Sequence, residues 1–357
     1  MKRLTIITII WVLFFAPARA QKLQAFADSI RQAYHIPELG YAVVSSDSVL
    51  ELQVMGVHKR KTHDAASLKD RFRIGSNTKA ITGFIAAQLV DQGKLSWDTK
   101  FFEICPELRL NSEPAYYNLT LQQLLSFRTK LFPYTYTYDK PTQDQFSGDE
   151  DQQRYQFIQW FLQHPPVQTD DSINFSNLSY VAAGLMLEKA SGKSYKELVV
   201  ALGAQLQIDF HFGQPNADPD QPWGHDAKLS PEPPQDDYKL NWLLAAGNIN
   251  VSLPDYAKFI QLQLQGLQGR SNLLTKKEFN FLHYGLEKFS IGWFSDTDEH
   301  SHIFSHNTGN PGTFLTSVYV YKDENRAYIL FANAQTDETE EGLDVLYDEL
   351  KKRYQAR

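Results

Sequence analysis

A serine and a lysine, Ser76 and Lys79, stand three residues apart where an apolar helical stretch begins. Residues at this spacing lie on one face of a helix, so the lysine amine can reach the serine hydroxyl. An amine that is partly desolvated becomes neutral and can accept the hydroxyl proton while the serine attacks a carbonyl group. Serine and asparagine before an apolar run are also good helix caps. The pair alone therefore fits either a nucleophilic site or simple capping.

The first twenty residues have the pattern of a secretory signal peptide. Lys2 and Arg3 precede an apolar run, and Ala18-Arg19-Ala20 is a small-x-small cleavage site. The run is too short to span a bilayer comfortably. We therefore expect residues 1–20 to be a signal peptide, and the mature domain, residues 21–357, to be periplasmic or secreted by a bacterium.

The composition limits the class of protein and its partners. With 357 residues, of which 42% are hydrophobic, the chain can bury a large core in one domain or two lobes. A formal charge of −7 argues against nucleic acid or anionic lipid as a partner. Cys105 is the only cysteine and lies far from the cleavage site. We therefore expect no internal disulfide, and no stable membrane anchor after cleavage.

Hydrophobic spacing predicts helices and strands in a definite order. An amphipathic helix opens the mature chain over residues 23–34, and two hairpin strands follow. The middle of the chain is mostly helical, strand patterns return after it, and a last helix places Leu343, Leu346 and Leu350 on one face. The expected strands cover residues 41–44, 49–57, 289–294, 313–321 and 326–332, and the expected middle helices cover residues 80–92, 121–126, 155–163, 178–190 and 256–265.

This order predicts an α/β (α+β) fold with two lobes. We expect an antiparallel sheet built from both chain ends and flanked by the terminal helices, formed by residues from about 21–75 and 289–357. An inserted, mostly helical lobe is expected over about residues 76–288. Two irregular stretches interrupt it: residues 132–153 are polar and aromatic, and residues 214–237 are rich in proline, which forbids regular structure there.

Further motifs follow the serine–lysine pair in order along the chain. They are Asn174-Phe175-Ser176-Asn177 before an apolar helix, Ala246-Gly247-Asn248, Ile291-Gly292-Trp293, and His306-Asn307-Thr308-Gly309-Asn310-Pro311-Gly312. Over about residues 26–331 these segments resemble the serine β-lactamase-like superfamily, which contains class C β-lactamases, D-alanyl-D-alanine carboxypeptidases and related esterases. The resemblance implies the β-lactamase/transpeptidase-like fold, a cleft between the lobes, Ser76 as nucleophile, Lys79 as its base, and no cofactor.

The second motif departs from the family pattern of Tyr-x-Asn. Phe175 stands where the family has a tyrosine whose phenol relays protons for the serine and for the deacylating water. Phenylalanine has no hydroxyl, and losing one general acid or base typically costs about a hundredfold to ten-thousandfold in rate. Asn177 matches the family asparagine, which implies contact with a substrate amide.

The third motif fits the family in two registers. Anchored on Pro311-Gly312, its first position is His306; anchored on Phe314, it is Asn307-Thr308-Gly309. We favour a site that contains His306 and Thr308, although the sequence leaves open which side chain faces the cleft. The two expected oxyanion donors are the N–H group of Ser76 and that of Gly309 or Asn310.

A third departure lies at residues 124–130, where Leu-Leu-Ser-Phe-Arg-Thr-Lys replaces the family's Leu-Leu-Ser-His-Thr-Ser-Gly. The resemblance places this region at the rim of the cleft, so substrate choice is expected to have diverged. Two replacements for the missing phenol remain open: His306 as a base, or one of the tyrosines that follow. These tyrosines are Tyr134, Tyr136 and Tyr138.

Acidic and histidine side chains gather shortly before the third motif. They have no defined ligand spacing, so we expect a solvated polar turn and no bound metal. The group consists of Asp296, Asp298, Glu299, His300, His302 and His306.

The sequence as a whole predicts an exported serine hydrolase that forms an acyl-enzyme at Ser76. Its substrate would be a small molecule or peptide with an ester or amide bond, including peptidoglycan-derived and β-lactam-like compounds. The alternative is a catalytically impaired or acyl-trapping binding protein on the same scaffold, because Phe175 removes part of the expected proton relay.

Overall fold

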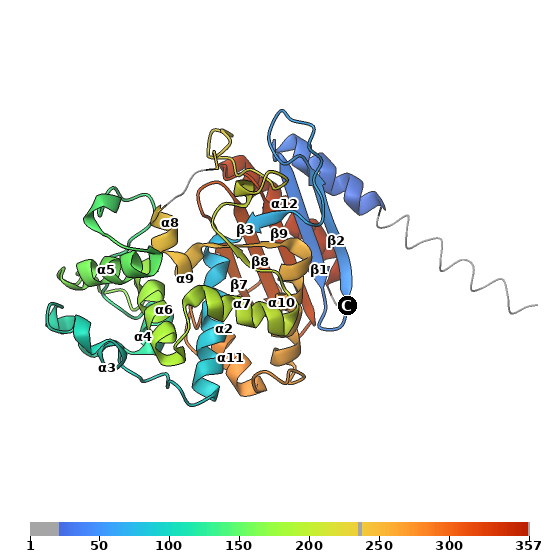
Figure 1. Cartoon of the computed structure of the whole chain (residues 1–357). Helices are drawn as coiled ribbons and strands as arrows, with labels where there is room; N and C mark the ends of the chain where they lie inside the picture. Colours follow the sequence, from blue (N-terminus) through green and yellow to red (C-terminus); the bar gives the residue numbers. More distant parts are fainter. Residues whose placement is uncertain (1–20, 235–237, 356–357) are drawn as a thin grey trace, which may run out of the picture.

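The computed structural model describes residues 21–234 and 238–355, so the expected signal peptide lies outside the described residues. A six-stranded antiparallel sheet in the order β2-β1-β9-β8-β7-β6 forms one part of the molecule (Figure 1). Strands from both chain ends meet in it, as the sequence predicts. The strands are β1 (Glu38–Val44), β2 (Val49–Gly56), β6 (Phe294–Thr297), β7 (Ile303–Gly309), β8 (Leu315–Tyr321) and β9 (Arg326–Ala332).

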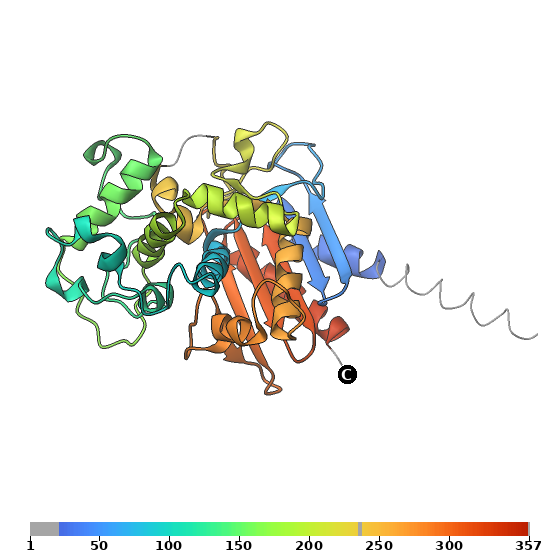
Figure 2. The same ribbon diagram turned by 60° about the horizontal axis from the view of Figure 1, so that its bottom comes forward.

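Helices cover both faces of this sheet (Figure 2). The opening helix, residues 21–33, and α12 (Asp337–Tyr354) pack on one face through Leu23, Leu343 and Leu346. Strand β1 alternates accordingly, because successive side chains of a strand point to opposite faces. Tyr41 and Val43 contact the terminal helices, whereas Ala42 and Val44 belong to the core on the other side.

The opposite face is covered by α2 (Thr78–Asp91), α10 (Leu253–Leu267) and α11 (Lys276–Tyr284). Helices α10 and α11 lie within the range 76–288 expected for the helical lobe, yet they pack on the sheet: α10 contacts β1 and β9, and α11 contacts β6. The reason is apolar burial. Tyr256, Phe259 and Ile260 of α10 are fully buried, and each such side chain contributes roughly 1.5–3 kcal/mol on burial.

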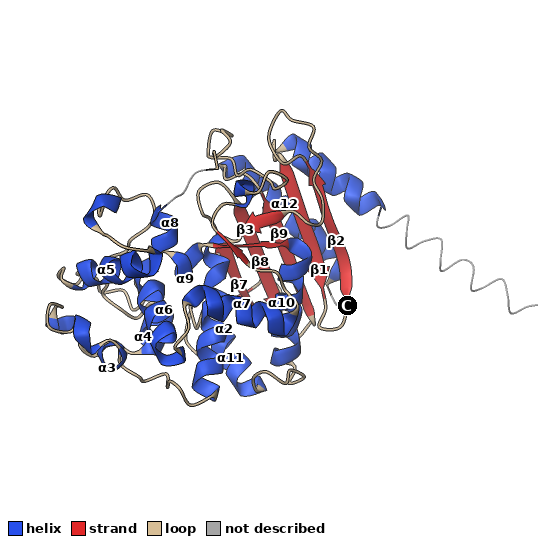
Figure 3. Ribbon diagram, in the orientation of Figure 1, coloured by secondary structure: helices blue, strands red, loops and turns tan. Residues whose placement is uncertain are grey.

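The remaining helices form a separate lobe beside the sheet (Figure 3). Its core packs α6 against α4 and α9, and a Cβ on Gly184 of α6 would lie 2.8 Å from that of Ala245, so the helices approach closely here. The helices are α3 (Phe101–Ile104), α4 (Leu121–Leu125), α5 (Glu150–Leu162), α6 (Asn177–Ser191), α7 (Tyr195–Leu206), α8 (Tyr238–Trp242) and α9 (Leu244–Gly247).

The structure adds or moves several elements relative to the sequence expectation. A second small sheet, β3-β5-β4, is formed by β3 (Arg71–Arg73), β4 (His211–Phe212) and β5 (Ile249–Ser252). The strand expected over residues 289–294 was wrong, because Gly292 has a φ of +85° and the chain turns there before β6 begins. Among the described residues, no helix combines the length and the apolar character that crossing a membrane requires.

Candidate active site

Ser76 lies in a 3-10 turn, η1 (Gly75–Asn77), that leads directly into α2. Neither end of this junction has a side-chain capping bond. The Asn77 side chain instead reaches the sheet, where its Nδ2 donates to Oγ1 of Thr316 on β8 over 2.8 Å. The Ser76 hydroxyl bonds to Lys79, with 2.9 Å between Oγ and Nζ. The capping interpretation of Ser76 therefore does not hold, and the hydroxyl is available for chemistry.

Lys79 is buried in the first turn of α2. Its Nζ lies 2.8 Å from the backbone oxygen of Ala246 in α9 and 5.5 Å from the ring centroid of Tyr180 in α6. Burial removes water from the ammonium group, and this lowers the pKa of Lys79 to about 7. A large fraction of the side chain is thus neutral near pH 7. In that form its lone pair can accept the Ser76 proton while an N–H remains on Ala246.

A cavity of about 450 Å³ opens beside this pair, within the usual size range of small-molecule sites. It brings together most of the residues that the sequence singled out from four distant segments. Gly309 and Asn310 are not part of the lining. The lining residues are Ser76, Lys79, Phe127, Tyr134, Thr135, Phe175, Ser176, Asn177, Phe289, Phe294, His306, Asn307 and Thr308.

The register of β7 orients the third motif. Asn307 is buried with its Nδ2 directed at α2 and the preceding turn, donating to the backbone oxygens of Gly292 at 2.8 Å and Ser76 at 3.4 Å. His306 is the neighbouring residue and points to the other face of the strand. Its ring stacks on Phe294 and Tyr319. The side chain of the third motif that faces the serine turn is therefore Asn307, whereas His306 and Thr308 share the opposite face of the strand.

Burial lowers the pKa of His306, although Asp296 acts in the other direction. Its neutral ring is thus available at pH 7 to accept a proton. Its contacts are ring contacts at the cleft wall rather than a hydrogen bond to Ser76 or Lys79. The role of His306 as a base remains a prediction.

The end of β7 lies against the serine turn. A Cβ on Gly309 would collide with the backbone oxygen of Ile74, so only glycine permits this approach. The Asn310 backbone nitrogen lies 2.9 Å from the position that a Cβ on Gly75 would take. The chain around Asn310 therefore lies beside the serine turn, which agrees with the expectation that Ser76 and Asn310 are the oxyanion donors.

The second motif lines the opposite wall. Phe175 is 52% exposed, which is unusual for a large aromatic side chain, and its ring contacts Phe127 and Phe294. Asn177 begins α6, and its Nδ2 donates to the backbone oxygen of Tyr134 over 3.1 Å. The asparagine amide thus fixes the tyrosine-containing segment at the cleft.

The tyrosines after residue 130 form part of the site's surroundings. Tyr134 lines the cavity, and its ring packs between Tyr138 and Phe157. Tyr136 places its phenol beside Gly312. Of the three candidates for the missing phenol, Tyr134 is therefore the one that the structure brings to the cleft.

Sequence reasoning missed three aromatic residues of the cavity wall as site residues. Phe127 has a φ of +58° and is buried, and Phe289 and Phe294 were assigned only to a strand. The substitution of phenylalanine for the family histidine at position 127 was the available signal. The other two carried none, because an apolar residue in a strand pattern is expected to pack in a core.

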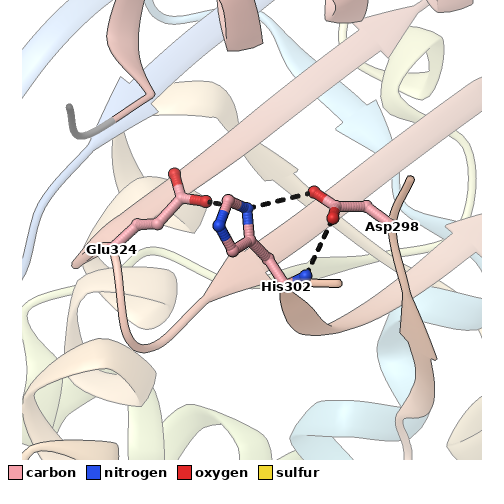
Figure 4. A group of neighbouring side chains, drawn as sticks. All are labelled: Asp298, His302 and Glu324. Atoms are coloured by element: carbon pink, nitrogen blue, oxygen red, sulfur yellow. Dashed lines mark hydrogen bonds and ion pairs between the residues drawn. The ribbon is translucent and has the colours of Figure 1, made fainter. Parts of the chain in front are cut away.

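The acidic and histidine group expected to be a polar turn lies at the β6–β7 connection (Figure 4). Nδ1 of His302 lies 3.5 Å from Asp298 and 3.1 Å from Glu324. Lys351 of α12 donates to Asp298 over 2.6 Å. Burial would raise the pKa of Asp298, but the bond from Lys351 and the bonds from the backbone N–H groups of His302 and His300 together outweigh it and hold the pKa at about 2. Asp298, His302 and Glu324 thus lie together, and the ion pair between Lys351 and Asp298 attaches this turn to α12.

A larger groove of about 710 Å³ lies between α5 and the α6–α7 region. Three of its charged side chains have ion-pair partners: Lys189 bonds to Glu107, and Asp151 and Glu188 both lie against Arg154. No serine–lysine hydrogen bond is present among the described residues of this groove. The serine–lysine pair instead lines the smaller cleft.

A sheet covered by terminal helices, a helical lobe beside it, and a buried lysine one turn after an accessible serine define a serine hydrolase scaffold of the β-lactamase and penicillin-binding-protein type. The family model described as Beta-lactamase matches residues 21–351. The chain belongs to the β-lactamase family.

Individual relatives are distant. Protein flp of Staphylococcus aureus is 22% identical over 329 residues, covering 89% of this chain and 64% of the relative. The chain thus spans just under two thirds of that relative's length. Two solved structures, a class C β-lactamase from Rhodobacter sphaeroides and the D-alanine carboxypeptidase AmpC from Burkholderia cenocepacia, superpose with TM-scores of 0.73 and 0.72 at 17% and 16% identity. Each superposition covers 92% of this chain and 99% of the other. At such identities the likeness shows the fold.

Proposed function

We propose that the protein is an exported serine hydrolase that forms an acyl-enzyme at Ser76 on an ester or amide of a small molecule or peptide. The observation that carries this proposal is the 2.9 Å contact between Ser76 Oγ and a lysine whose pKa is lowered to about 7. A serine hydroxyl that is hydrogen-bonded to a desolvated, neutral amine is activated as a nucleophile, because the amine can accept its proton. Export rests on the signal pattern of residues 1–20.

The acylation step follows from this geometry. Neutral Lys79 accepts the proton of the Ser76 hydroxyl as Oγ bonds to the substrate carbonyl carbon. The carbonyl oxygen becomes negative and accepts hydrogen bonds from the N–H groups of Ser76 and Asn310. When the bond to the leaving group breaks, the Lys79 ammonium returns the proton to the departing oxygen or nitrogen. The acyl group remains on Ser76 and Lys79 is neutral again.

Deacylation requires a base that activates water. Lys79, neutral after acylation, is one candidate in reach of the acyl-serine. Phe175 contributes no proton transfer, so His306 or Tyr134 at the cavity wall is the second candidate. Slow deacylation would make the protein an acyl-trapping binding protein, which is the second candidate function and is favoured by Phe175.

Labelling with a fluorophosphonate, followed by peptide mass spectrometry, tests the proposal. We expect one adduct, on the peptide containing Ser76, and none in Ser76→Ala. A matched control is Ser96→Ala, which removes an exposed hydroxyl outside the cleft and should label like wild type. Absence of an adduct on folded wild-type protein contradicts the hydrolase. An ester-derived acyl mass that persists for hours would instead assign acyl trapping.

A further inference from the structure

One wall of the cleft consists almost entirely of aromatic rings. Phe127 packs on Phe289 with 4.7 Å between ring centroids and on Phe175 with 5.1 Å, and Phe294 lies 4.7 Å from Phe289. His306 extends this wall, stacked 5.3 Å from Phe294. The rings come from four separate segments, the loop after α4, the loop before α6, the turn before β6, and the sheet edge. Their convergence beside Ser76 gives the cleft a continuous apolar surface.

The exposure of Phe175 supports a binding role for this wall. An aromatic ring that is half exposed keeps apolar surface in contact with water, which is unfavourable unless a ligand covers it. Phe175 touches three other rings and still leaves 52% of its surface open. An apolar group lying in the cavity would cover this surface.

The cleft also lacks a permanent positive charge. Among the described residues that line it, only Lys79 and His306 can become cationic, and burial lowers the pKa of both. Asn307 occupies the strand position facing the serine turn, and its amide is bonded to backbone oxygens. A carboxylate entering the cavity would lose hydration and meet no permanently charged cation among these lining residues.

A fixed cation next to Phe127 in the chain, Arg128, is held by backbone oxygens. Its guanidinium donates to the backbone oxygens of Ser126 and Phe289 at 3.0 Å and of Glu287 at 2.9 Å. These bonds tie the two segments that carry Phe127 and Phe289. Arg128 therefore stabilises the aromatic wall and is not free to bind a carboxylate.

We propose that the cleft selects neutral esters or amides with an apolar or aromatic acyl group and discriminates against substrates that carry a carboxylate. This inference rests on the proposed acyl transfer at Ser76. The acyl group lies along the rings of Phe127, Phe175, Phe289 and Phe294, with its carbonyl carbon at Ser76. Each methylene that is removed from water on this wall contributes about a fourfold gain in kcat/KM.

Two substrate series on the full mature chain test the proposal. In the first, p-nitrophenyl acetate, butyrate, hexanoate and octanoate should show kcat/KM rising by about fourfold per added methylene until the wall is covered. In the second, p-nitrophenyl hexanoate should be cleaved at least tenfold faster than mono-p-nitrophenyl adipate, which ends in a carboxylate.

Variants assign these preferences to the wall. Phe294→Ala should flatten the chain-length series, whereas Phe294→Leu should retain most of its slope; Leu110→Ala, at an 88% exposed position outside the cleft, should retain all of it. Phe175→Arg places a cation at a half-exposed position that tolerates it, and should reduce the hexanoate-to-adipate ratio by at least tenfold.

The outcomes separate this inference from the proposed function. A flat chain-length series, or equal cleavage of hexanoate and adipate, overturns the apolar preference while fluorophosphonate labelling of Ser76 keeps the hydrolase. Absence of both labelling and cleavage overturns the two together. If Phe294→Ala does not fold, the two wild-type series and Phe175→Arg still decide the question.

Discussion

The proposed activation of Ser76 depends on the dry surroundings of Lys79. No acidic side chain lies among the described residues of the cavity lining, so the lysine has a backbone oxygen, a hydroxyl and an aromatic ring as neighbours. Such neighbours do not offset the cost of burying an ammonium group, so the neutral form of the Lys79 amine is favoured. If the same lysine were exposed, it would stay protonated near pH 7 and could not accept the Ser76 proton.

Phe175→Tyr is expected to speed deacylation. A phenol at this position restores a proton-transfer group to the cleft wall, and such a group contributes about a hundredfold or more when it is well placed. The rate of loss of an ester-derived acyl mass from Ser76 measures the effect. Phe175→Leu is the matched control and should not accelerate it. Equal deacylation rates in wild type and Phe175→Tyr would show that another group already carries the proton.

At the level of residues, the sequence could predict the serine, the lysine and the missing phenol, because each lies in a short motif. It could not choose between His306 and Asn307. Adjacent residues of a strand face opposite sides, and which side faces the serine depends on the pairing of β7 with β8. The aromatic wall also could not be predicted from the sequence, because Phe127 and Phe289 are far apart in the chain and come together only in the tertiary fold.

Among the elements, the turn before β6 lies in close contact with α2. Gly292 has a φ of +85°, and a Cβ on it would lie 2.7 Å from the Cα of Ala80 and from the backbone oxygen of Lys79. Its own backbone oxygen accepts the bond from Asn307. This glycine thus holds the third motif against the helix that carries the lysine.

Gly292→Ala is expected to lower the free energy of unfolding by about 3 kcal/mol or more and to slow labelling of Ser76, because strain in φ adds to a collision with α2. Gly93→Ala is the control, since Gly93 has a φ of +68° but no atom within 4 Å of its would-be Cβ. It should cost only about 1 kcal/mol and leave labelling unchanged. Urea unfolding gives both values. Similar losses in the two variants would argue against the close approach at Gly292.

Long helices were predictable from their apolar residues, which recur on one face of α10 and α12 and form longer apolar runs in α2 and α6. The strands β3, β4 and β5 have two to four residues, which is too short to show a recognisable alternation of apolar and polar residues. The packing of α10 on the sheet also could not be read locally. Its spacing identifies an apolar face but not the surface that this face meets.

At the scale of the whole molecule, His283 joins three elements of the sheet lobe. On α11, its Nδ1 lies 2.6 Å from Ser305 Oγ on β7 and its Nε2 lies 3.1 Å from Gln263 Oε1 on α10. The ring also stacks on Trp293. Burial lowers the pKa of His283 to about 3, so the folded protein keeps it neutral in mild acid.

The stability of the fold should therefore fall as the pH is lowered from about 6.5 to about 3. In this window the unfolded chain binds a proton at His283 that the folded chain does not, at a cost of up to about 1.4 kcal/mol per pH unit. His283→Gln removes this contribution while it keeps an amide in place. Urea unfolding at several pH values should show a shallower acid slope for the variant than for wild type. Parallel slopes would mean that His283 is protonated in the fold.

The central claim is that neutral Lys79 activates Ser76, and the pH dependence of fluorophosphonate labelling tests it most directly. The second-order labelling rate of wild type should rise as the pH increases through about 7 and then level, because deprotonation of Lys79 creates the base. Lys79→Met should label more slowly, by about a hundredfold or more, without that inflection. A flat wild-type profile, or equal rates in wild type and Lys79→Met, would contradict the account.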